Sequence, residues 1–147
     1  MDIEFKKITI DDWELARSLE EGAASDMFAP CDGEEGYKKY IGESQVYAII
    51  NGNKAIVTIS YKNQDDGAVL VNGLTVMPEY RGQGIASLAM NKLLDEIGNK
   101  NCSLVVHPGN TPAILIYLHF DFCITGWKDN YFGDGEPRLY LQRIVGP

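Results

Sequence analysis

The 147-residue sequence has only three cysteines, Cys31, Cys102 and Cys123. An odd number without a Cys-x-x-Cys pair favours neither a disulfide framework nor a thiolate zinc site, and the two histidines add no metal-ligand spacing, so we expect no metal. The N-terminal residues contain no basic segment followed by an apolar run, and no stretch approaches the ~18 apolar residues of a membrane span. We therefore expect a cytoplasmic protein that does not associate with membranes.

Basic side chains are also scarce. Thirteen Lys and Arg stand against 21 Asp and Glu, which gives a formal net charge of −8. A surface of this sign repels phosphate backbones and attracts cationic partners, so the composition predicts no binding of nucleic acid. The chain length and the 45% content of apolar residues fit a single domain spanning residues 1–147.

The apolar pattern predicts seven strands and four helices in the order βααβββαβαββ. The expected strands are 3–8, 46–50, 55–61, 68–77, 102–106, 122–127 and 138–144, and the expected helices are 11–21, 34–41, 82–98 and 111–119. Gly22 is expected to end the first helix, Asn51-Gly52 indicates a hairpin, and Gly73 predicts a β-bulge within its strand. This order predicts an α/β fold with a mixed sheet and helices on both faces.

Residues 76–87 form a strand, a glycine-bearing turn and the start of a helix. Gly82 and Gly84 have no Cβ, so backbone N–H groups there can approach a pyrophosphate closely. The first helical turn adds unpaired N–H groups and the positive end of the helix dipole, which an acidic protein can use because the attraction is local. A P-loop is excluded because the chain has no Gly-Lys pair, and a Rossmann fingerprint fails because Ser87 replaces its third glycine.

Residues 81–86 read Arg-x-x-Gly-x-Ala and resemble the [RQ]-x-x-G-x-[GA] motif of the GNAT (Gcn5-related N-acetyltransferase) superfamily. Residues 110–117 read Asn-x-x-Ala-x-x-x-Tyr and resemble the second acetyl-CoA element of that family, whose order of elements also matches. The resemblance implies a GNAT fold, in which a central mixed, mostly antiparallel, twisted sheet is flanked by helices and a bulged strand precedes the cofactor helix. It also implies an acetyl-CoA-dependent N-acetyltransferase in which an amine attacks directly in a ternary complex.

The resemblance assigns roles to individual residues. The residues that would hold the pyrophosphate, mainly through backbone amides, are Arg81, Gly82, Gln83, Gly84, Ile85, Ala86 and Ser87. The backbone of Leu74 and Val76 would pair with the pantetheine arm, which Asn110 and Ala113 would contact from the second element. The Leu74 N–H would stabilise the oxyanion formed from the thioester carbonyl. Tyr117 would protonate the leaving thiolate as general acid, and the alternative is that it only packs in the helix groove.

The sequence departs from the family pattern at two places. Asp121 precedes Phe122 where the family commonly has glycine, so we expect the turn there to differ. The bulged strand also lacks the glutamate that often serves as general base. Three alternatives remain open: a water relay, another carboxylate such as Glu20, Glu21 or Asp26, or an amine that binds already neutral.

We expect the acceptor to be a primary amine on a small cationic molecule or a peptide. Asp26, Phe28 and Tyr131 lie in the segments that would face it, and carboxylates beside aromatic rings suit an ammonium group. His107 is interpreted more readily as structural than as catalytic. The alternative function is a non-catalytic acyl-CoA-binding or regulatory module that lost its base. A homodimer is common in this fold, and nothing in the sequence specifies one.

Overall fold

The computed structural model describes residues 3–23 and 31–145. Within these ranges the strands are β1 (Ile3–Ile8), β2 (Gln45–Asn51), β3 (Lys54–Asn63), β4 (Val69–Val76), β5 (Cys102–Val106), β6 (Cys123–Lys128) and β7 (Arg138–Arg143). The α-helices are α1 (Trp13–Ala23), α2 (Gly33–Glu43), α3 (Ile85–Ile97) and α4 (Thr111–His119), and short 3-10 helices are η1 (Ile10–Asp12) and η2 (Pro78–Tyr80). The succession of strands and α-helices is the predicted one. No helix in the described ranges is long and apolar enough to cross a membrane.

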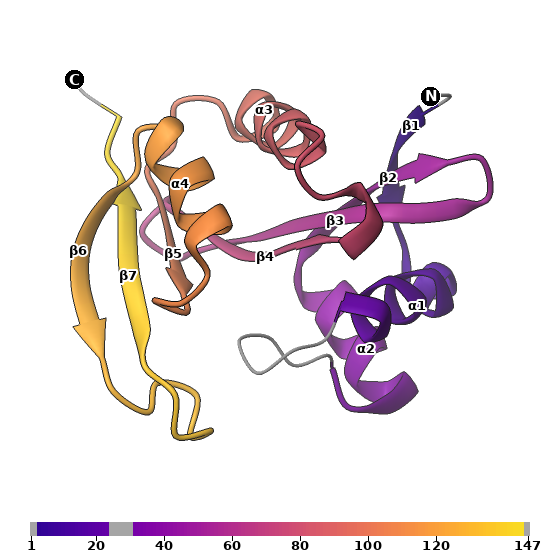
Figure 1. Ribbon diagram of the computed structural model, residues 1–147, viewed down its shortest axis with the longest axis horizontal. Helices are drawn as coiled ribbons and strands as arrows, with labels where there is room; N and C mark the ends of the chain where they lie inside the picture. The colour runs from indigo at the N-terminus through magenta and orange to yellow at the C-terminus, as the bar shows by residue number, and fades with distance from the viewer. Residues whose placement is uncertain (1–2, 24–30, 146–147) are drawn as a thin grey trace.

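The seven strands form one sheet in the order β1-β2-β3-β4-β5-β7-β6. Only β4 and β5 run parallel, and every other neighbouring pair is antiparallel. Helices α1 and α2 lie on one face of the sheet, and α3 and α4 lie on the other (Figure 1). The prediction of a mixed, mostly antiparallel sheet with helices on both faces is confirmed.

Each face of the sheet buries its own apolar cluster. Leu19 of α1 and Tyr37 of α2 pack with residues of β2 on one side, and Met90 of α3 packs with Leu104 of β5 on the other. Helix α1 continues to the buried Ala23, so the prediction that Gly22 ends it is wrong. The apolar stripe of α1 extends through this glycine, and burying Ala23 stabilises the last turn despite the cost of a helical glycine.

The two irregular features that the glycines predicted are both present in the sheet. Asn51 pairs with Lys54, which leaves a two-residue hairpin turn that contains Gly52 in a left-handed conformation. On β4, Gly73 pairs with Ser60 and Val71 pairs with Tyr61, so Asn72 is the extra residue of a β-bulge.

Strand β4 separates from β5 just before this bulge. The two strands pair only at Val69 with Cys102 and at Leu70 with Ser103. From the bulge onward, the edge of β4 that faces β5 therefore has no strand partner.

Candidate functional site

The turn before α3 leaves several backbone N–H groups pointing out of the helix. Gly82 and Gly84 both have φ of 77°, and Gly84 caps the helix, so α3 begins at Ile85 rather than at residue 82 as predicted. A Cβ built on either glycine would meet no atom within 4 Å, so the space in front of them is open. The first helical hydrogen bond runs from the Leu88 N–H to the Gly84 carbonyl at 3.1 Å. The N–H groups of residues 85–87 therefore have no helical acceptor and suit an anion.

Side chains of the same turn fix its shape. The Arg81 Nε donates to the Val76 carbonyl at 3.3 Å, which ties the turn to the end of β4. The Gln83 Nε2 donates to the Glu79 carbonyl at 3.1 Å. Arg81 thus has a structural contact in addition to the positive charge that it brings near the open N–H groups.

The unpaired edge of β4 presents the backbone of Leu74 and Val76 to the gap. The Met77 N–H donates to the Ile56 carbonyl of β3 at 2.9 Å. Because successive residues of a strand direct their backbone groups to opposite sides, the N–H groups of Leu74 and Val76 point away from β3. They face the region where β4 and β5 have separated, which suits an extended ligand that pairs with β4.

A chain of hydrogen-bonded polar side chains covers the bulge of β4 on the face of the sheet that carries α1 and α2. The Tyr40 hydroxyl hydrogen-bonds to the Ser60 hydroxyl, Ser60 donates to the Asn72 Oδ1 at 2.7 Å, and the Asn72 Nδ2 donates to the Ser44 Oγ at 2.9 Å. A Cβ on Gly73 would lie 2.8 Å from both the Ser60 Oγ and the Tyr40 hydroxyl oxygen, which explains the glycine. The sequence reasoning identified Gly73 and missed this chain, whose only signal was a polar residue inside each apolar strand.

Helix α4 brings Asn110 and Tyr117 to the same face of the sheet as α3 (Figure 1). Asn110 caps α4, and its Oδ1 accepts from the Ala113 N–H at 3.4 Å, so both residues of the second motif shape the helix start. Tyr117 is 6% exposed and packs against Phe122, with ring centroids 5.7 Å apart. Burial raises the pKa of the Tyr117 phenol, so it keeps its proton at neutral pH and is available as a donor.

The turn after α4 contains Asp121, which has a φ of 71°. Its N–H donates to the Leu118 carbonyl at 3.1 Å, and the N–H of Phe122 donates to the Tyr117 carbonyl at 3.1 Å. Asp121 therefore adopts the left-handed conformation that glycine favours, and Phe122 still packs against Tyr117.

Of the two candidate base carboxylates that lie in the described residues, Glu20 is the buried one. Its side chain lies on α1, the residue is 7% exposed, and its Oε2 has no hydrogen-bond partner. Burial raises the pKa of Glu20 from 4.5 to about 7. Glu21 is exposed, and Asp26 and Phe28 lie outside the described residues.

The β6–β7 loop and the end of β5 hold the remaining predicted residues. Tyr131 is 39% exposed, and the Lys128 Nζ lies 5.6 Å from its ring centroid. The His107 Nδ1 accepts from the Gly109 N–H at 2.9 Å, and its Nε2 lies 3.5 Å from a Glu136 carboxylate oxygen. The Nδ1 of His107 is thus engaged by the backbone, whereas its buried Nε2 forms no hydrogen bond.

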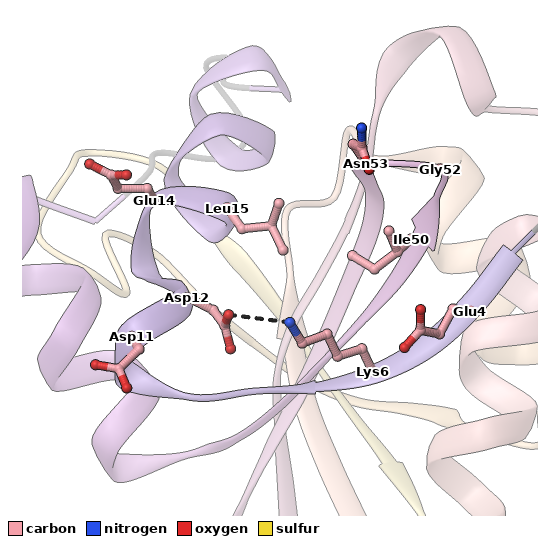
Figure 2. Close-up of a pocket in the computed structure, with 9 residues that line it drawn as sticks. All are labelled: Glu4, Lys6, Asp11, Asp12, Glu14, Leu15, Ile50, Gly52 and Asn53. Carbon is pink, nitrogen blue, oxygen red and sulfur yellow. Dashed lines mark hydrogen bonds and ion pairs between the residues drawn. The ribbon is translucent and has the colours of Figure 1, made fainter.

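A separate surface depression of about 570 Å³ lies beside β1, η1 and α1 (Figure 2). Charged side chains such as Glu4 and Asp11 line it, and the Lys6 Nζ lies 3.3 Å from the Asp12 carboxylate. It contains none of the predicted site residues, and β1 is at the edge of the sheet, three strands from β4. Across residues 3–23 and 31–145, no group of three or more His, Cys, Asp or Glu could hold a metal ion.

Comparisons with known proteins agree with this fold. Solved structures of the same fold include the ribosomal-protein-S18-alanine N-acetyltransferase from Escherichia coli (17% identity, TM-score 0.82, covering 99% of this chain and 96% of that one). Ard1 from Thermoplasma volcanium is similar at 19% identity and a TM-score of 0.82, with 100% of both chains covered. The PaiA N-acetyltransferase from Thermoplasma acidophilum, in complex with coenzyme A, is similar at 17% identity and a TM-score of 0.77, covering 98% and 99%.

The comparison with curated protein sequences found no match. The family comparison, in contrast, matches residues 9–122, which include most of the sheet, α3 and α4. The chain therefore belongs to the acetyltransferase (GNAT) family.

Proposed function

We propose that this chain transfers the acetyl group of acetyl-CoA to a primary amine on a small cationic molecule or a peptide. The observation that carries the proposal is the unpaired edge of β4 next to the open N–H groups of α3. An acyl-CoA has an extended arm that can pair with a strand and a pyrophosphate that suits a helix N-terminus. The coenzyme A in the Thermoplasma acidophilum structure supports this choice of substrate.

In this proposal the turn before α3 and β4 bind the donor. The N–H groups of Gly82 through Ser87 bind the pyrophosphate, and Arg81 adds positive charge beside it. The backbone of Leu74 and Val76 pairs with the pantetheine arm, and the Leu74 N–H stabilises the oxyanion that forms when the amine attacks. One such donor typically contributes about 3–4 kcal/mol to the transition state.

Tyr117 completes the donor side as the general acid. Its buried phenol holds a proton that the thiolate takes as the carbon–sulfur bond breaks. Asn110 and Ala113 fix the start of α4 and so set the position of Tyr117.

The acceptor is proposed to be cationic because the chain carries a net charge of −8, which attracts positively charged molecules. The relatives with solved structures include proteins named as N-acetyltransferases, and this supports transfer to nitrogen. One of them is named for an alanine of a ribosomal protein, so a peptide amine belongs in any set of test acceptors.

A second candidate function is a non-catalytic acyl-CoA-binding module. The observation in its favour is that the residues of β4 before Gly73, Val69 to Asn72, include no carboxylate that could act as base.

Titration calorimetry with CoA and a thiol-release assay with acetyl-CoA separate the two functions. The assay uses spermidine, an aminoglycoside, free amino acids and a basic peptide as acceptors. We expect CoA to bind and at least one amine to accelerate thiol release. Binding without accelerated release would favour the non-catalytic module, and the absence of CoA binding to the folded protein would refute both.

A further inference from the structure

Two buried polar atoms between α1 and α2 lack hydrogen-bond partners. One is the Oε2 of Glu20, on a residue that is 7% exposed, and the other is the hydroxyl of Tyr37, on a residue that is 0% exposed. The Cys31 backbone lies near this hydroxyl and lowers its pKa, but the contact lacks the geometry of a hydrogen bond. Buried polar groups nearly always have partners, because leaving one unsatisfied costs about 1–3 kcal/mol. The two lie close enough that the charge of Glu20 adds to the rise that burial causes in the pKa of Tyr37. Helices α1 and α2 pack against each other, so the two groups leave hydrogen-bonding capacity in one layer that a polar ligand could use.

The same site is adjacent to the bulge of β4. Helix α1 packs against β3 and β4, and the charge of Glu20 also contributes to the raised pKa of Tyr40, after the larger effect of burial. The Tyr40 hydroxyl lies directly over Gly73, as the 2.8 Å to a Cβ built there shows. Glu20, Tyr37 and Tyr40 therefore connect the interior of the α1–α2 layer with the strand that is proposed to hold the thioester.

The direction of the hydroxyl chain leaves Tyr40 able to accept a hydrogen bond. The Asn72 Oδ1 can only accept, so the single hydroxyl proton of Ser60 is committed to it. Tyr40 must then donate its own proton to Ser60, and its phenol oxygen keeps its lone pairs. An ammonium group is a donor without acceptors and suits this oxygen.

We propose that Glu20 is the general base of this enzyme, and that Tyr37 and Tyr40 hold the acceptor ammonium against it. This inference rests on the proposed function and names the acceptor side of the same site. It chooses one of the carboxylates that the sequence left open, from a helix rather than from the bulged strand.

The proton balance of the step is complete with these groups. The Glu20 carboxylate takes one proton from R–NH₃⁺ and becomes the neutral acid, which leaves R–NH₂. The nitrogen lone pair forms the C–N bond with the thioester carbon, the C–S bond breaks, and its electron pair leaves on sulfur. Tyr117 gives its proton to that thiolate, and the proton that the new amide nitrogen sheds restores the phenol. Glu20 then releases its proton to solvent.

The negative charge of Glu20 disfavours ionisation of the titratable groups near it. Tyr37, Tyr40 and Cys31 are the titratable groups whose pKa values rise further because of the Glu20 charge, and Glu21 acts on Tyr37 in the same direction. From the sheet, Ser60 and Asn72 contribute uncharged groups to the hydroxyl chain. None of these groups is positively charged. A cationic acceptor would therefore bring a positive charge to the site, and its binding favours the ionised form of Glu20.

The pH profile of Glu20→Gln tests the proposal, with Glu21→Gln on the exposed side of the same helix as the matched control. The thiol-release assay uses the best acceptor among spermidine, an aminoglycoside, free amino acids and a basic peptide. In the wild type and in Glu21→Gln, kcat/KM should rise with pH through about 7, as burial of Glu20 implies. Glu20→Gln should lower kcat/KM at pH 7 about 100-fold and move the rise towards pH ~10, where the amine itself loses its proton. If the wild type is active and Glu20→Gln shows the same pH profile of kcat/KM as Glu21→Gln, Glu20 is not the base. The proposed function would still stand in that case.

A second variant separates the acceptor site from simple packing. Tyr37→Phe removes a hydroxyl whose contact with the Cys31 backbone lacks the geometry of a hydrogen bond, so the fold should be about as stable as the wild type. We expect the KM for the amine to rise about tenfold while the affinity for CoA is unchanged. An unchanged KM would overturn the assignment of Tyr37.

Carbon NMR of glutamate side chains gives a readout that needs no turnover. The Glu20 carboxyl, assigned by its absence in Glu20→Gln, should titrate near pH 7, and spermidine added to the CoA complex should lower that midpoint. Titration near the ordinary value of 4.5, or no response to spermidine, would overturn the proposal even if no acceptor in the assay is turned over.

Discussion

The burial of Glu20 predicts a specific change of stability with pH. Its pKa is about 7 in the folded protein, compared with an ordinary value of 4.5. Between these two pH values the native state holds a proton that the unfolded chain has lost, so unfolding becomes more favourable as pH rises. The stabilising proton is fully present below pH 4.5 and is lost as pH rises through about 7. At about 1.4 kcal/mol for each pKa unit, the whole effect is about 3 kcal/mol.

Glu20→Gln isolates this effect because glutamine has nearly the same shape and cannot ionise. The variant should gain stability relative to the wild type as pH rises, by about 2–3 kcal/mol between pH 5 and pH 8. Urea unfolding at both pH values measures the difference, and subtraction removes the contributions of all other titrating groups that the two proteins share. The value is large enough to shift the urea midpoint by about 1 M.

Glu21→Gln is the control for the chemical change itself, since Glu21 is exposed on the next position of the helix. Its stability difference from the wild type should stay within about 0.5 kcal/mol at both pH values. If Glu20→Gln also showed the same difference at pH 5 and pH 8, the carboxyl would not have a raised pKa, and the reasoning from burial would be refuted.

Three further predictions concern the donor side. Gly84→Ala should cost about 1–2 kcal/mol of stability because the φ of Gly84 is 77°, and it should weaken CoA binding. Gly98→Ala, at the other end of α3, should also lose stability but leave the affinity for CoA unchanged. Urea unfolding measures the stability of both variants, and calorimetry measures their affinity for CoA. Tyr117→Phe should lower kcat about 100-fold with CoA affinity retained, and unchanged turnover at saturating substrates would remove it as the acid. Gly73→Ala should cost about 1–3 kcal/mol, since its Cβ would lie 2.8 Å from Ser60 and Tyr40 oxygens, and should reduce turnover more than CoA binding.

The backbone features of the proposed donor side were predictable because their signals are local. Gly73, Gly82 and Gly84 each mark a backbone conformation or a close approach that a Cβ opposes, and a strand, a turn and a helix start follow one another within 12 residues. The start of α3 was placed three residues early, since the left-handed Gly84 ends the turn and caps the helix. Helix boundaries of this kind depend on backbone angles that the apolar pattern does not contain.

The contacts around the proposed acceptor side were less predictable because they join distant segments. Tyr40 meets Ser60 across 20 positions, and Ser60 meets Asn72 across 12, so no short motif connects them. Glu20 did carry a signal: it lies four residues after Ala16 and three before Ala23, both of which are buried, so helical spacing placed it on the apolar face. The sequence could not show that its Oε2 lacks a partner there, because that depends on what α2 and β4 bring to the same place.

The two proposed substrates have opposite charges, and the protein can attract both because the attractions act over different ranges. The net charge of −8 creates a field that draws a cationic amine, and salt screens it beyond about 8 Å under physiological conditions. The diphosphate of CoA is repelled by that field at a distance. In the proposed site it would meet the N–H groups of residues 85–87 and the dipole of α3, whose effect is confined to the first helical turn. Arg81 is the only basic residue between positions 78 and 87, and its Nε already donates to the Val76 carbonyl. The local dipoles, rather than a cluster of cationic side chains, must therefore supply most of the attraction. An acidic surface and an anionic substrate are therefore compatible as long as the phosphate site is built from backbone.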